Sequence, residues 1–426
     1  MENRSFIVKG DVIYAGEKKE VLSSQNAYVV CIDGICEGVF PEIPEKWKNL
    51  TLYDYTGQLV MPGMTDLHVH APQYTFRGLG MDLELLDWLK EHTFPEEAKY
   101  QNISYASAAY KIFTEDLKNS FTTRACIFAT LHKEATLELM DQLEDTGLIT
   151  YVGKVNMDRN GSEELCEASA EQSAKDTISW LSEIEKRGYW RTKPILTPRF
   201  VPSCSDALME KLSEIQKEYK LRIQSHLSEN ISEIAWVKEL VPQAECYGQA
   251  YELFDLLGSE TYPAIMAHCV YSDRKEMDLL KKHHTYIAHC PDSNFNVASG
   301  IAPIRKYLDE NISVGLGSDV AGGATLSFPQ AMAHAVQASK MYWRLKDQGV
   351  KPLTFEEVFY LATLGGGSYF GKVGSFLKGY ECDLLVVDDR MIRRMRDLTV
   401  KERAERMIYL PGECTISEKF VAGEKL

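Results

Sequence analysis

Eight short runs of apolar and β-branched residues alternate with longer stretches of helical periodicity, and this alternation limits the possible folds more than any other feature. The runs cover residues 58–70, 121–130, 149–158, 193–200, 221–226, 264–270, 285–291 and 312–320. Residues 83–91 and 207–219 lie between runs and place their apolar side chains on one side of a helix. Alternating strands and helices are typical of parallel sheets. Eight repeats between residues 58 and 370 predict an α/β protein with a (β/α)8 TIM-like barrel.

The two ends of the chain differ from this middle region. Residues 5–56 and 373–426 contain short strand-like segments separated by turn residues, with few helix signals. We therefore predict that residues 1–57 and 373–426 together form one small β-sandwich domain, and that residues 58–372 form the barrel. Two separate β appendages are the alternative, but each would have only a thin core.

Composition narrows the possible partners and the compartment. The 426 residues include 47 Lys and Arg against 62 Asp and Glu, and the net charge of −15 disfavours nucleic acid while suiting cationic or neutral small substrates. No apolar run reaches the roughly 18 residues of a membrane span, and the first residues lack the pattern of a secretory or transit peptide. The ten cysteines are scattered without a CxxC pair. These features predict a cytoplasmic protein that binds neither nucleic acid nor membranes.

Metal-ligand side chains stand where several predicted strands end. His68 and His70 are two residues apart near the end of the first run, so both imidazoles point to the same face. His226, His268 and Asp319 come at the ends of the fifth, sixth and eighth runs. In a barrel, the carboxyl ends of the strands converge on one mouth, where active sites of this fold are built. Histidines with a carboxylate suit Zn²⁺ or Fe²⁺, so we predict a metal site at this mouth.

Two further residues at predicted strand ends have open roles. Glu229 follows His226 by three residues and is either a proton shuttle for a metal-activated water molecule or a carboxylate at a helix start. His289 ends the seventh run and either orients the mouth or is a buried structural histidine. The remaining five histidines stand in helix or loop contexts, where solvated or hydrogen-bonded positions are expected: His92, His132, His283, His284 and His334.

Other catalytic signatures are missing from the sequence. There is no HExxH, GxSxG or GxxxxGK[ST] motif, and no GxGxxG follows a predicted strand. Residues 132–134 match HxE, but the PCxxC that completes the cytidine-deaminase type of zinc site does not follow. The glycine-rich segment 361–371 comes after a helix, so close packing explains it better than phosphate binding.

Sequence blocks between residues 55 and 390 follow a known order. They include PGMTDLHVHAPQYTFRG, FTTRACIFATLH, QSHLSEN, IMAHCVY, IAHCPDSN and VGLGSDVAGG, together with the more specific TFPEEA and TPRF. On these motifs the chain resembles the amidohydrolase superfamily and, within it, the guanine deaminases. The resemblance implies a metal-dependent aminohydrolase that releases ammonia from C2 of guanine to leave xanthine, and that works as a homodimer.

The resemblance also implies roles in the chemistry for individual residues. One Zn²⁺ per chain, with Fe²⁺ as the alternative metal, would be held by His68, His70, His226 and Asp319. Glu229 would move the protons, while His268 and Asp319 would orient the attacking water.

The residues that bind substrate are implied in the same way. Gln73 and Arg199 would address the polar edge of guanine, Phe200 would pack on its ring, and His226 would also contact it. Binuclear relatives carry a carboxylated lysine on strand four, and the fourth run here ends without one. Lys154 on the third run leaves a second metal open from the residues alone, while the resemblance favours one metal.

Two alternatives stand beside this interpretation. An aminohydrolase of another aminated heterocycle, such as 8-oxoguanine, a pterin or an s-triazine, would use the same metal site. A barrel that has become a non-catalytic scaffold is the second alternative, and the presence of every implied ligand and of Glu229 argues against it.

Overall fold

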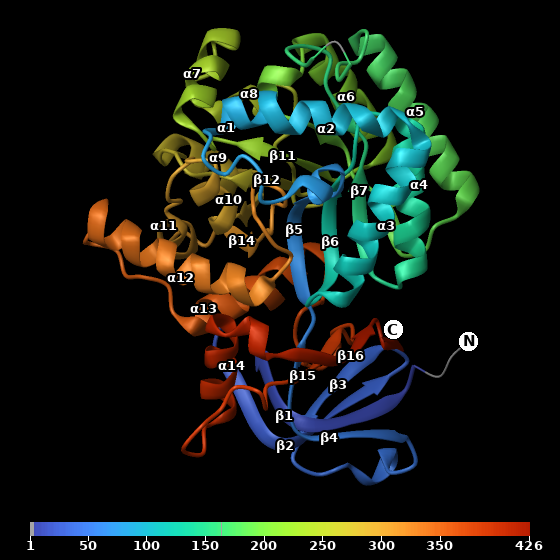
Figure 1. The fold of residues 1–426 in the computed structure, drawn as a ribbon, viewed down its shortest axis with the longest axis vertical. Coiled ribbons are helices and arrows are strands. Elements are labelled where there is room, and N and C mark those ends of the chain that lie inside the picture. Colours follow the sequence, from blue (N-terminus) through green and yellow to red (C-terminus); the bar gives the residue numbers. More distant parts are fainter. Residues whose placement is uncertain (1–3, 163) are drawn as a thin grey trace.

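The computed structural model describes residues 4–162 and 164–426, which form a barrel and an adjoining β-sheet (Figure 1). The barrel strands are β5 (Met64–His70), β6 (Thr122–Phe128), β7 (Ile149–Gly153), β8 (Val155–Asn156), β9 (Thr192–Pro194), β10 (Thr197–Pro198), β11 (Ile223–Leu227), β12 (Ala264–His268), β13 (Tyr286–His289) and β14 (Ser313–Leu316). Each of the eight predicted runs contains one or two of these strands, so the predicted barrel is confirmed.

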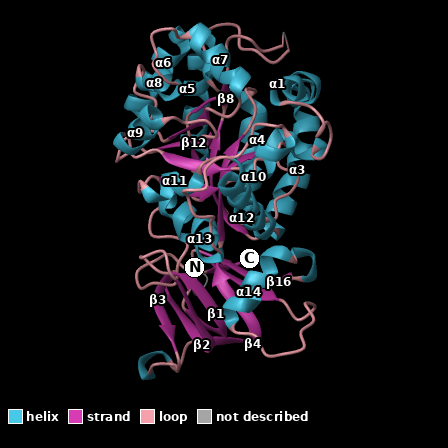
Figure 2. Ribbon diagram, turned by 90° about the vertical axis from the view of Figure 1, so that its left-hand side faces the viewer, coloured by secondary structure: helices cyan, strands magenta, loops and turns pink. Residues whose placement is uncertain are grey.

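Helices surround the barrel strands (Figure 2). They are α1 (Leu85–Trp88), α2 (Phe94–Ala98), α3 (Ile103–Asn119), α4 (Lys133–Thr146), α5 (Ala170–Arg187), α6 (Asp206–Tyr219), α7 (Ile231–Leu240), α8 (Tyr247–Glu252), α9 (Arg274–Lys282), α10 (Pro291–Asn296), α11 (Ile304–Asp309), α12 (Phe328–Leu345) and α13 (Phe355–Tyr360). Across the described residues, none of the helices is long and apolar enough to span a membrane.

The barrel is closed by parallel pairing and by two hydrogen bonds between its first and last strands. β5, β6, β7 and β9 pair in that order, and β11 to β14 pair in chain order. A bridge between Leu196 and Ile223 joins the two sets. On the other side, the amide of Asp319 donates to the carbonyl of His68 at 2.8 Å, and the amide of His70 donates to the carbonyl of Val320 at 3.1 Å. The hydrogen bonds that close the barrel are therefore made by His68, His70 and Asp319, which were predicted to lie at its mouth.

The fourth predicted run is interrupted by prolines. It appears as two short pieces, β9 and β10, which end at Pro194 and Pro198. Proline has no amide hydrogen to donate to a neighbouring strand, so continuous pairing is lost at these positions. The chain still reaches the mouth here, because β10 pairs with β8.

Helix α5 illustrates why the outer helices form where they do. The Ser169 side chain accepts a hydrogen bond from the amide of Gln172 and caps the first turn, and Gly188 ends the helix at a φ of +67°. Trp180 and Ile184 are four residues apart on its buried face and pack into the main apolar cluster. A capped amphipathic helix of this kind covers the barrel wall from outside.

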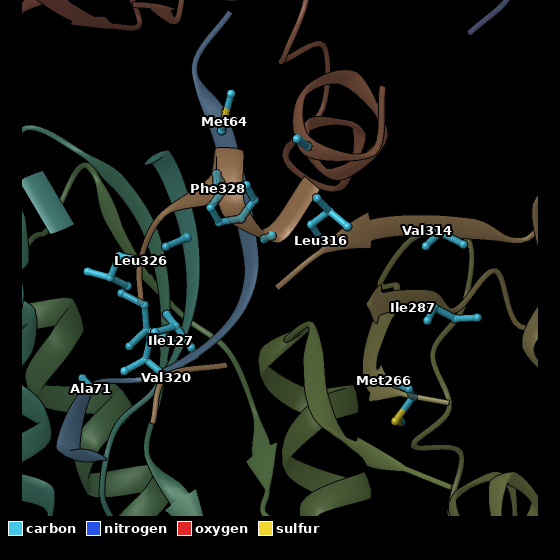
Figure 3. Packing of buried hydrophobic residues seen from close by; sticks show 14 of the residues in the cluster. Met64, Ala71, Ile127, Met266, Ile287, Val314, Leu316, Val320, Leu326 and Phe328 are labelled. Atoms are coloured by element: carbon cyan, nitrogen blue, oxygen red, sulfur yellow. The ribbon is translucent and has the colours of Figure 1, made fainter. Parts of the chain in front are cut away.

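The main apolar cluster fills the space between the strands and the helices. Figure 3 shows part of it, with Val314 and Leu316 of β14 and Ile287 of β13. The glycine-rich segment packs beside it, and a Cβ atom on Gly315 would lie 2.8 Å from the Cα of Gly366. This contact is too short for a larger residue, which agrees with close packing as the reason for the glycines.

Both ends of the chain meet in one seven-stranded sheet. Its strands are β1 (Phe6–Ala15), β2 (Val21–Ile32), β3 (Ile35–Phe40), β4 (Thr51–Pro62), β15 (Leu384–Asp388), β16 (Thr415–Val421) and β17 (Glu424–Lys425). Their order is β17-β16-β15-β4-β1-β2-β3. A joint domain from both termini is therefore present, whereas the two facing sheets of a sandwich are not confirmed, because hydrogen bonds connect all seven strands into one sheet. The predicted boundary at residues 57 and 58 falls inside β4.

Two helical predictions need correction. The C-terminal region contains α14 (Val400–Tyr409), which we did not expect; its start is a capping box, in which Thr399 and Glu402 satisfy each other's backbone amides. The helix expected over residues 83–91 is α-helical only over α1 and continues as a π-turn over Leu89–Thr93. Pro95 follows directly and cannot donate a backbone hydrogen bond, which favours such an irregular turn.

Candidate active site and metal centre

Five side chains predicted at strand ends converge at the mouth of the barrel. His68 and His70 come from β5, His226 from β11, His268 from β12, and Asp319 follows β14. The Nε2 atom of His70 lies 3.2 Å from the Nε2 atoms of both His68 and His226. Oδ1 of Asp319 lies 3.2 Å from Nε2 of His68 and 3.4 Å from Nε2 of His70. Side chains this close surround a single point, as a bound cation requires.

The first of these strands is irregular where it supplies two ligands. Pairing between β5 and β6 changes register between Asp66 and Val69, which marks a bulge at the position of His68. Bulges are common beside active sites because they change the direction of a side chain. His68 and His70 thereby reach the same centre, with their rings nearly perpendicular at 88°.

The hydrogen bonds and pKa values of these groups suit metal binding. Nδ1 of His226 lies 2.6 Å from the carbonyl oxygen of Arg199, which can only accept, so Nδ1 carries the hydrogen and Nε2 offers a lone pair to the centre. Burial lowers the pKa of His68, His70 and His226, which keeps these imidazoles neutral. Although burial acts to raise it, the imidazoles of His68 and His268 hold the pKa of Asp319 well below its ordinary value. Neutral imidazoles with an ionised carboxylate are the donor set of a borderline divalent cation.

Asp66 supports the centre from below and was not among the predicted site residues. It is fully buried and accepts from the amide of His68 at 3.1 Å, the amide of Ser318 at 3.0 Å and the hydroxyl of Ser318 at 2.5 Å. Burial raises its pKa to about 7. Its position two residues before His68, on the same face of the strand, is a signal that sequence reasoning could have used.

Glu229 and His268 lie together on one side of the centre. Oε2 of Glu229 is 3.4 Å from Nε2 of His268, which is 3.7 Å from Oδ2 of Asp319. The Ser299 hydroxyl donates to Oε1 of Glu229 at 2.8 Å, and Nδ1 of His268 lies 3.0 Å from Oδ1 of Asn294. Burial raises the pKa of Glu229 to about 7, so this carboxyl can both accept and donate a proton near neutral pH.

A small cavity opens over these groups. Gln73, Arg199, Phe200 and His226 line it, so all four residues predicted to contact substrate lie at this cavity. The rest of its lining is Leu85, Trp88, Leu89, Val297, Ser293, Glu233, His70, Glu229, His268 and Asp319. An apolar wall with a few polar groups at defined positions is typical of small-molecule sites.

Glu97 connects two of the cavity residues and was also missed. Its Oε1 accepts from Nε2 of Gln73 at 2.8 Å, and its Oε2 accepts from Nη1 of Arg199 at 2.5 Å. The side chain is buried in α2, far in sequence from Arg199. The TFPEEA block quoted for the resemblance contains this residue, but its spacing carries no sign of these partners.

The residues left open in the sequence lie apart from this centre. His289 is buried with neither ring nitrogen hydrogen-bonded among the described residues, and burial lowers its pKa to about 3. It belongs to none of the groups that could hold a metal in the described part of the chain. Nζ of Lys154 lies 2.5 Å from Oε1 of Glu167 in a buried ion pair, so this amine is engaged away from the centre.

Comparisons with known proteins agree with this geometry. Residues 59–425 match the sequence pattern of the Amidohydrolase family. The guanine deaminase of Dictyostelium discoideum is 35% identical over 444 residues, covering 99% of this chain and 98% of that protein. The human guanine deaminase is 38% identical over 381 residues, covering 87% of this chain and 83% of that protein.

A solved structure gives the same result. The guanine deaminase of C. acetobutylicum, with guanine bound in its active site, is 43% identical and superposes with a TM-score of 0.95, covering 99% of this chain and 100% of that one. The chain therefore belongs to the amidohydrolase family and, within it, to the guanine deaminase group.

Proposed function

We propose that this protein hydrolyses guanine to xanthine and ammonia, using one Zn²⁺ held by His68, His70, His226 and Asp319. The observation that carries the proposal is one cavity whose lining contains the three ligands His70, His226 and Asp319 together with Glu229, Gln73 and Arg199. The 43% identical relative with bound guanine supports the substrate. Fe²⁺ suits the same ligand types and is the alternative metal.

The ligands would supply hydrolytic chemistry through the metal. A divalent cation in such a site lowers the pKa of a bound water molecule towards neutrality and so provides hydroxide at physiological pH. His268 and Asp319 contact each other beside Glu229, and they orient the attacking oxygen towards the ring. Asp66 keeps the first and last strands, and with them His68 and Asp319, in place.

Glu229 moves the protons of the reaction. It accepts a proton from the attacking water and delivers it to a ring nitrogen while the C2–O bond forms and C2 becomes tetrahedral. It then takes the proton of the new C2 hydroxyl group and passes it to the amino group, so that the C2–N bond breaks, ammonia leaves, and the C2 carbonyl of xanthine remains. A carboxyl with a pKa of about 7 suits both directions of transfer.

Substrate recognition falls to three further side chains that line the same cavity. Arg199 and Gln73 present hydrogen-bond donors to the carbonyl edge of guanine, and the buried Phe200 ring, which lies 6.2 Å from the Trp236 ring, provides an apolar surface for the purine. His226 contributes both as a metal ligand and as a cavity wall.

The assignment of compartment and assembly belongs to the same proposal. All ten cysteines are free, which suits a reducing cytoplasm. A homodimer is expected from the family resemblance and is tested by the mass of the protein in solution.

The proposal is tested by following ammonia release from guanine with metal-loaded protein, alongside adenine, cytosine, 8-oxoguanine and a pterin. Rapid turnover of guanine with little turnover of the others supports it. Turnover of another heterocycle in place of guanine would keep the metal site and overturn the substrate. Protein that binds no metal under any loading condition would favour a non-catalytic scaffold.

A further inference from the structure

We propose that Glu97 is a positioning residue that fixes Gln73 and Arg199 and cancels the charge of Arg199, so that the cavity gives anionic purines no advantage over neutral ones. The inference rests on the proposed function, because it concerns how the same cavity distinguishes substrate from product. Glu97 itself is not among the described residues that line the cavity, and it acts through the two that do.

Three hydrogen bonds tie the groups together. Nη1 and Nη2 of Arg199 donate to Oε2 and Oε1 of Glu97 at 2.5 and 3.2 Å, a two-point contact that fixes the guanidinium plane. Nε2 of Gln73 donates to Oε1 of Glu97 at 2.8 Å. The side chains of Arg199 and Glu97 are only 4% and 2% exposed, so water does not compete for these bonds.

The carboxylate also decides which way the Gln73 amide points. Because an ionised carboxylate can only accept, the amide nitrogen of Gln73 must face Glu97. Its oxygen then accepts from the amide of Ala321 at 3.3 Å. One amide hydrogen remains for a ligand in the cavity, so Glu97 and Ala321 together set the donor that the substrate meets.

The charge balance at this end of the cavity follows from the same pairing. Arg199 is the one lysine or arginine among the described residues that line the cavity, and Glu97 neutralises it at contact distance. The other titratable groups that face the cavity are His70, His226, His268, Glu229, Glu233 and Asp319. A buried guanidinium without its carboxylate would attract anions strongly, because the low local dielectric screens it little.

This balance matters for release of the product. Replacing an amino group by a carbonyl makes xanthine a stronger acid than guanine, so part of the product is anionic at mildly alkaline pH. An uncompensated Arg199 would hold that anion, whereas the Arg199–Glu97 pair gives it no preference over a neutral purine. Glu97 thus weakens the binding of the anionic product, so that the product leaves and the next guanine can bind.

The test compares Glu97→Gln with Glu97→Asp in metal-loaded protein. The glutamine variant removes the charge and keeps the size, while the aspartate variant keeps the charge and shortens the reach. Glu167→Gln is the matched control, since it breaks the buried Lys154–Glu167 pair outside the cavity. For each protein we would measure kcat and KM for guanine, and calorimetric binding of xanthine and of hypoxanthine at mildly alkaline pH, where the second purine stays largely neutral.

In both Glu97 variants the KM for guanine should rise at least about tenfold with a smaller change in kcat, since a hydrogen bond to a charged group is lost or misplaced. In Glu97→Gln alone, binding should shift towards xanthine over hypoxanthine by about tenfold. Glu167→Gln should leave both quantities within about twofold of wild type, whatever its stability.

Two results would overturn the inference. One is a Glu97→Gln protein whose KM and purine preference match wild type. The other is a Glu97→Asp protein whose purine preference shifts as far as that of Glu97→Gln, because then charge is not the cause. Should the glutamine variant fail to fold, the rise in KM of Glu97→Asp decides the positioning role. Lack of guanine turnover by the wild type would instead sink the proposed function, and the calorimetric comparison would still judge Glu97.

Discussion

The mouth of the barrel and its junction with the β-sheet both bury charged groups, but they satisfy them differently. At the junction, Nε of Arg124 donates to Asp383 at 2.7 Å and its Nη2 donates to Glu381 at 2.8 Å. Asp383 also accepts from the amide of Ala422 at 2.8 Å. The two carboxylates thus accept from the arginine at three points, as expected for a structural ion pair.

The mouth has the opposite arrangement. The Nε2 atom of His70 lies 3.2 Å from the Nε2 atoms of both His68 and His226, and Oδ1 of Asp319 contacts His68 and His70. Neutral imidazoles placed this way direct lone pairs at the same point, which is unfavourable unless a cation fills it. Buried polar groups at the junction are paired within the protein, whereas those at the mouth need a bound cation. Buried groups that the protein alone leaves unpaired therefore mark the functional site.

Metal removal should have the largest effect. Dialysis against a strong chelator should lower guanine turnover by more than about a thousandfold, because hydroxide is then no longer supplied at neutral pH. Turnover and metal content should return together on adding Zn²⁺ or Fe²⁺, as measured by ammonia release and elemental analysis. Full activity in protein shown to be metal-free would break the comparison.

Replacement of Glu229 should come next. Glu229→Gln should lower kcat by about 10²- to 10⁴-fold while the protein keeps its metal, since the variant loses the group that transfers protons. Glu276→Gln is the matched control: Glu276 is equally buried, binds the amide of Gly248 at 2.7 Å and lies outside the cavity lining. Normal turnover by metal-loaded Glu229→Gln would contradict the assigned role.

The junction should behave in the reverse way. Asp383→Asn should lower the free energy of unfolding by about 3–5 kcal/mol, because it leaves Arg124 buried beside only one partner, with kcat nearly unchanged. Glu381→Gln, at the more exposed end of the same arginine, should cost no more than about 1 kcal/mol. Urea unfolding of both variants measures the two losses in the free energy of unfolding. Equal losses would show that burial does not determine how much each carboxylate stabilises the protein through Arg124.

The effect that is smallest per pH unit concerns Lys419, a buried amine that donates to the carbonyls of Lys118 and Thr122. Burial lowers its pKa to about 7, so between about pH 7 and 10.5 the unfolded chain binds the proton and the folded protein does not. Wild-type stability relative to Lys419→Met should therefore rise with pH in this window, by no more than about 1.4 kcal/mol per unit. A difference that stays constant or falls with pH would show that the amine stays charged when buried.

The sequence predicted the barrel and the convergence of the site well, for a definite physical reason. His226, His268 and Asp319 stand at the ends of apolar runs, and the ends of parallel strands must meet. Whether a residue stands at the end of a strand depends only on its neighbours in sequence, so it can be predicted from the sequence directly.

Contacts between distant segments were harder to predict. Glu97 meets Arg199 only because α2 packs against the mouth, and nothing in the spacing of 102 residues encodes that contact. Helix α14 is a different case, since the Thr399–Glu402 capping box was visible and was outweighed by the strand-like residues around it. Asp66 likewise shares the strand face of His68, but it stands inside the run and not at its end, where the predicted ligands stand.

One junction has a consequence for attempts to recombine this protein with others. Only Gly63 separates β4 of the sheet from β5 of the barrel, and its amide donates to the carbonyl of Asp383. A Cβ atom there would lie 2.2 Å from the Thr123 side chain, so the linkage tolerates neither a larger residue nor an inserted spacer. The terminal sheet is thus not a cassette that gene fusion can exchange, since any splice at its edge moves the strand that carries His68 and His70.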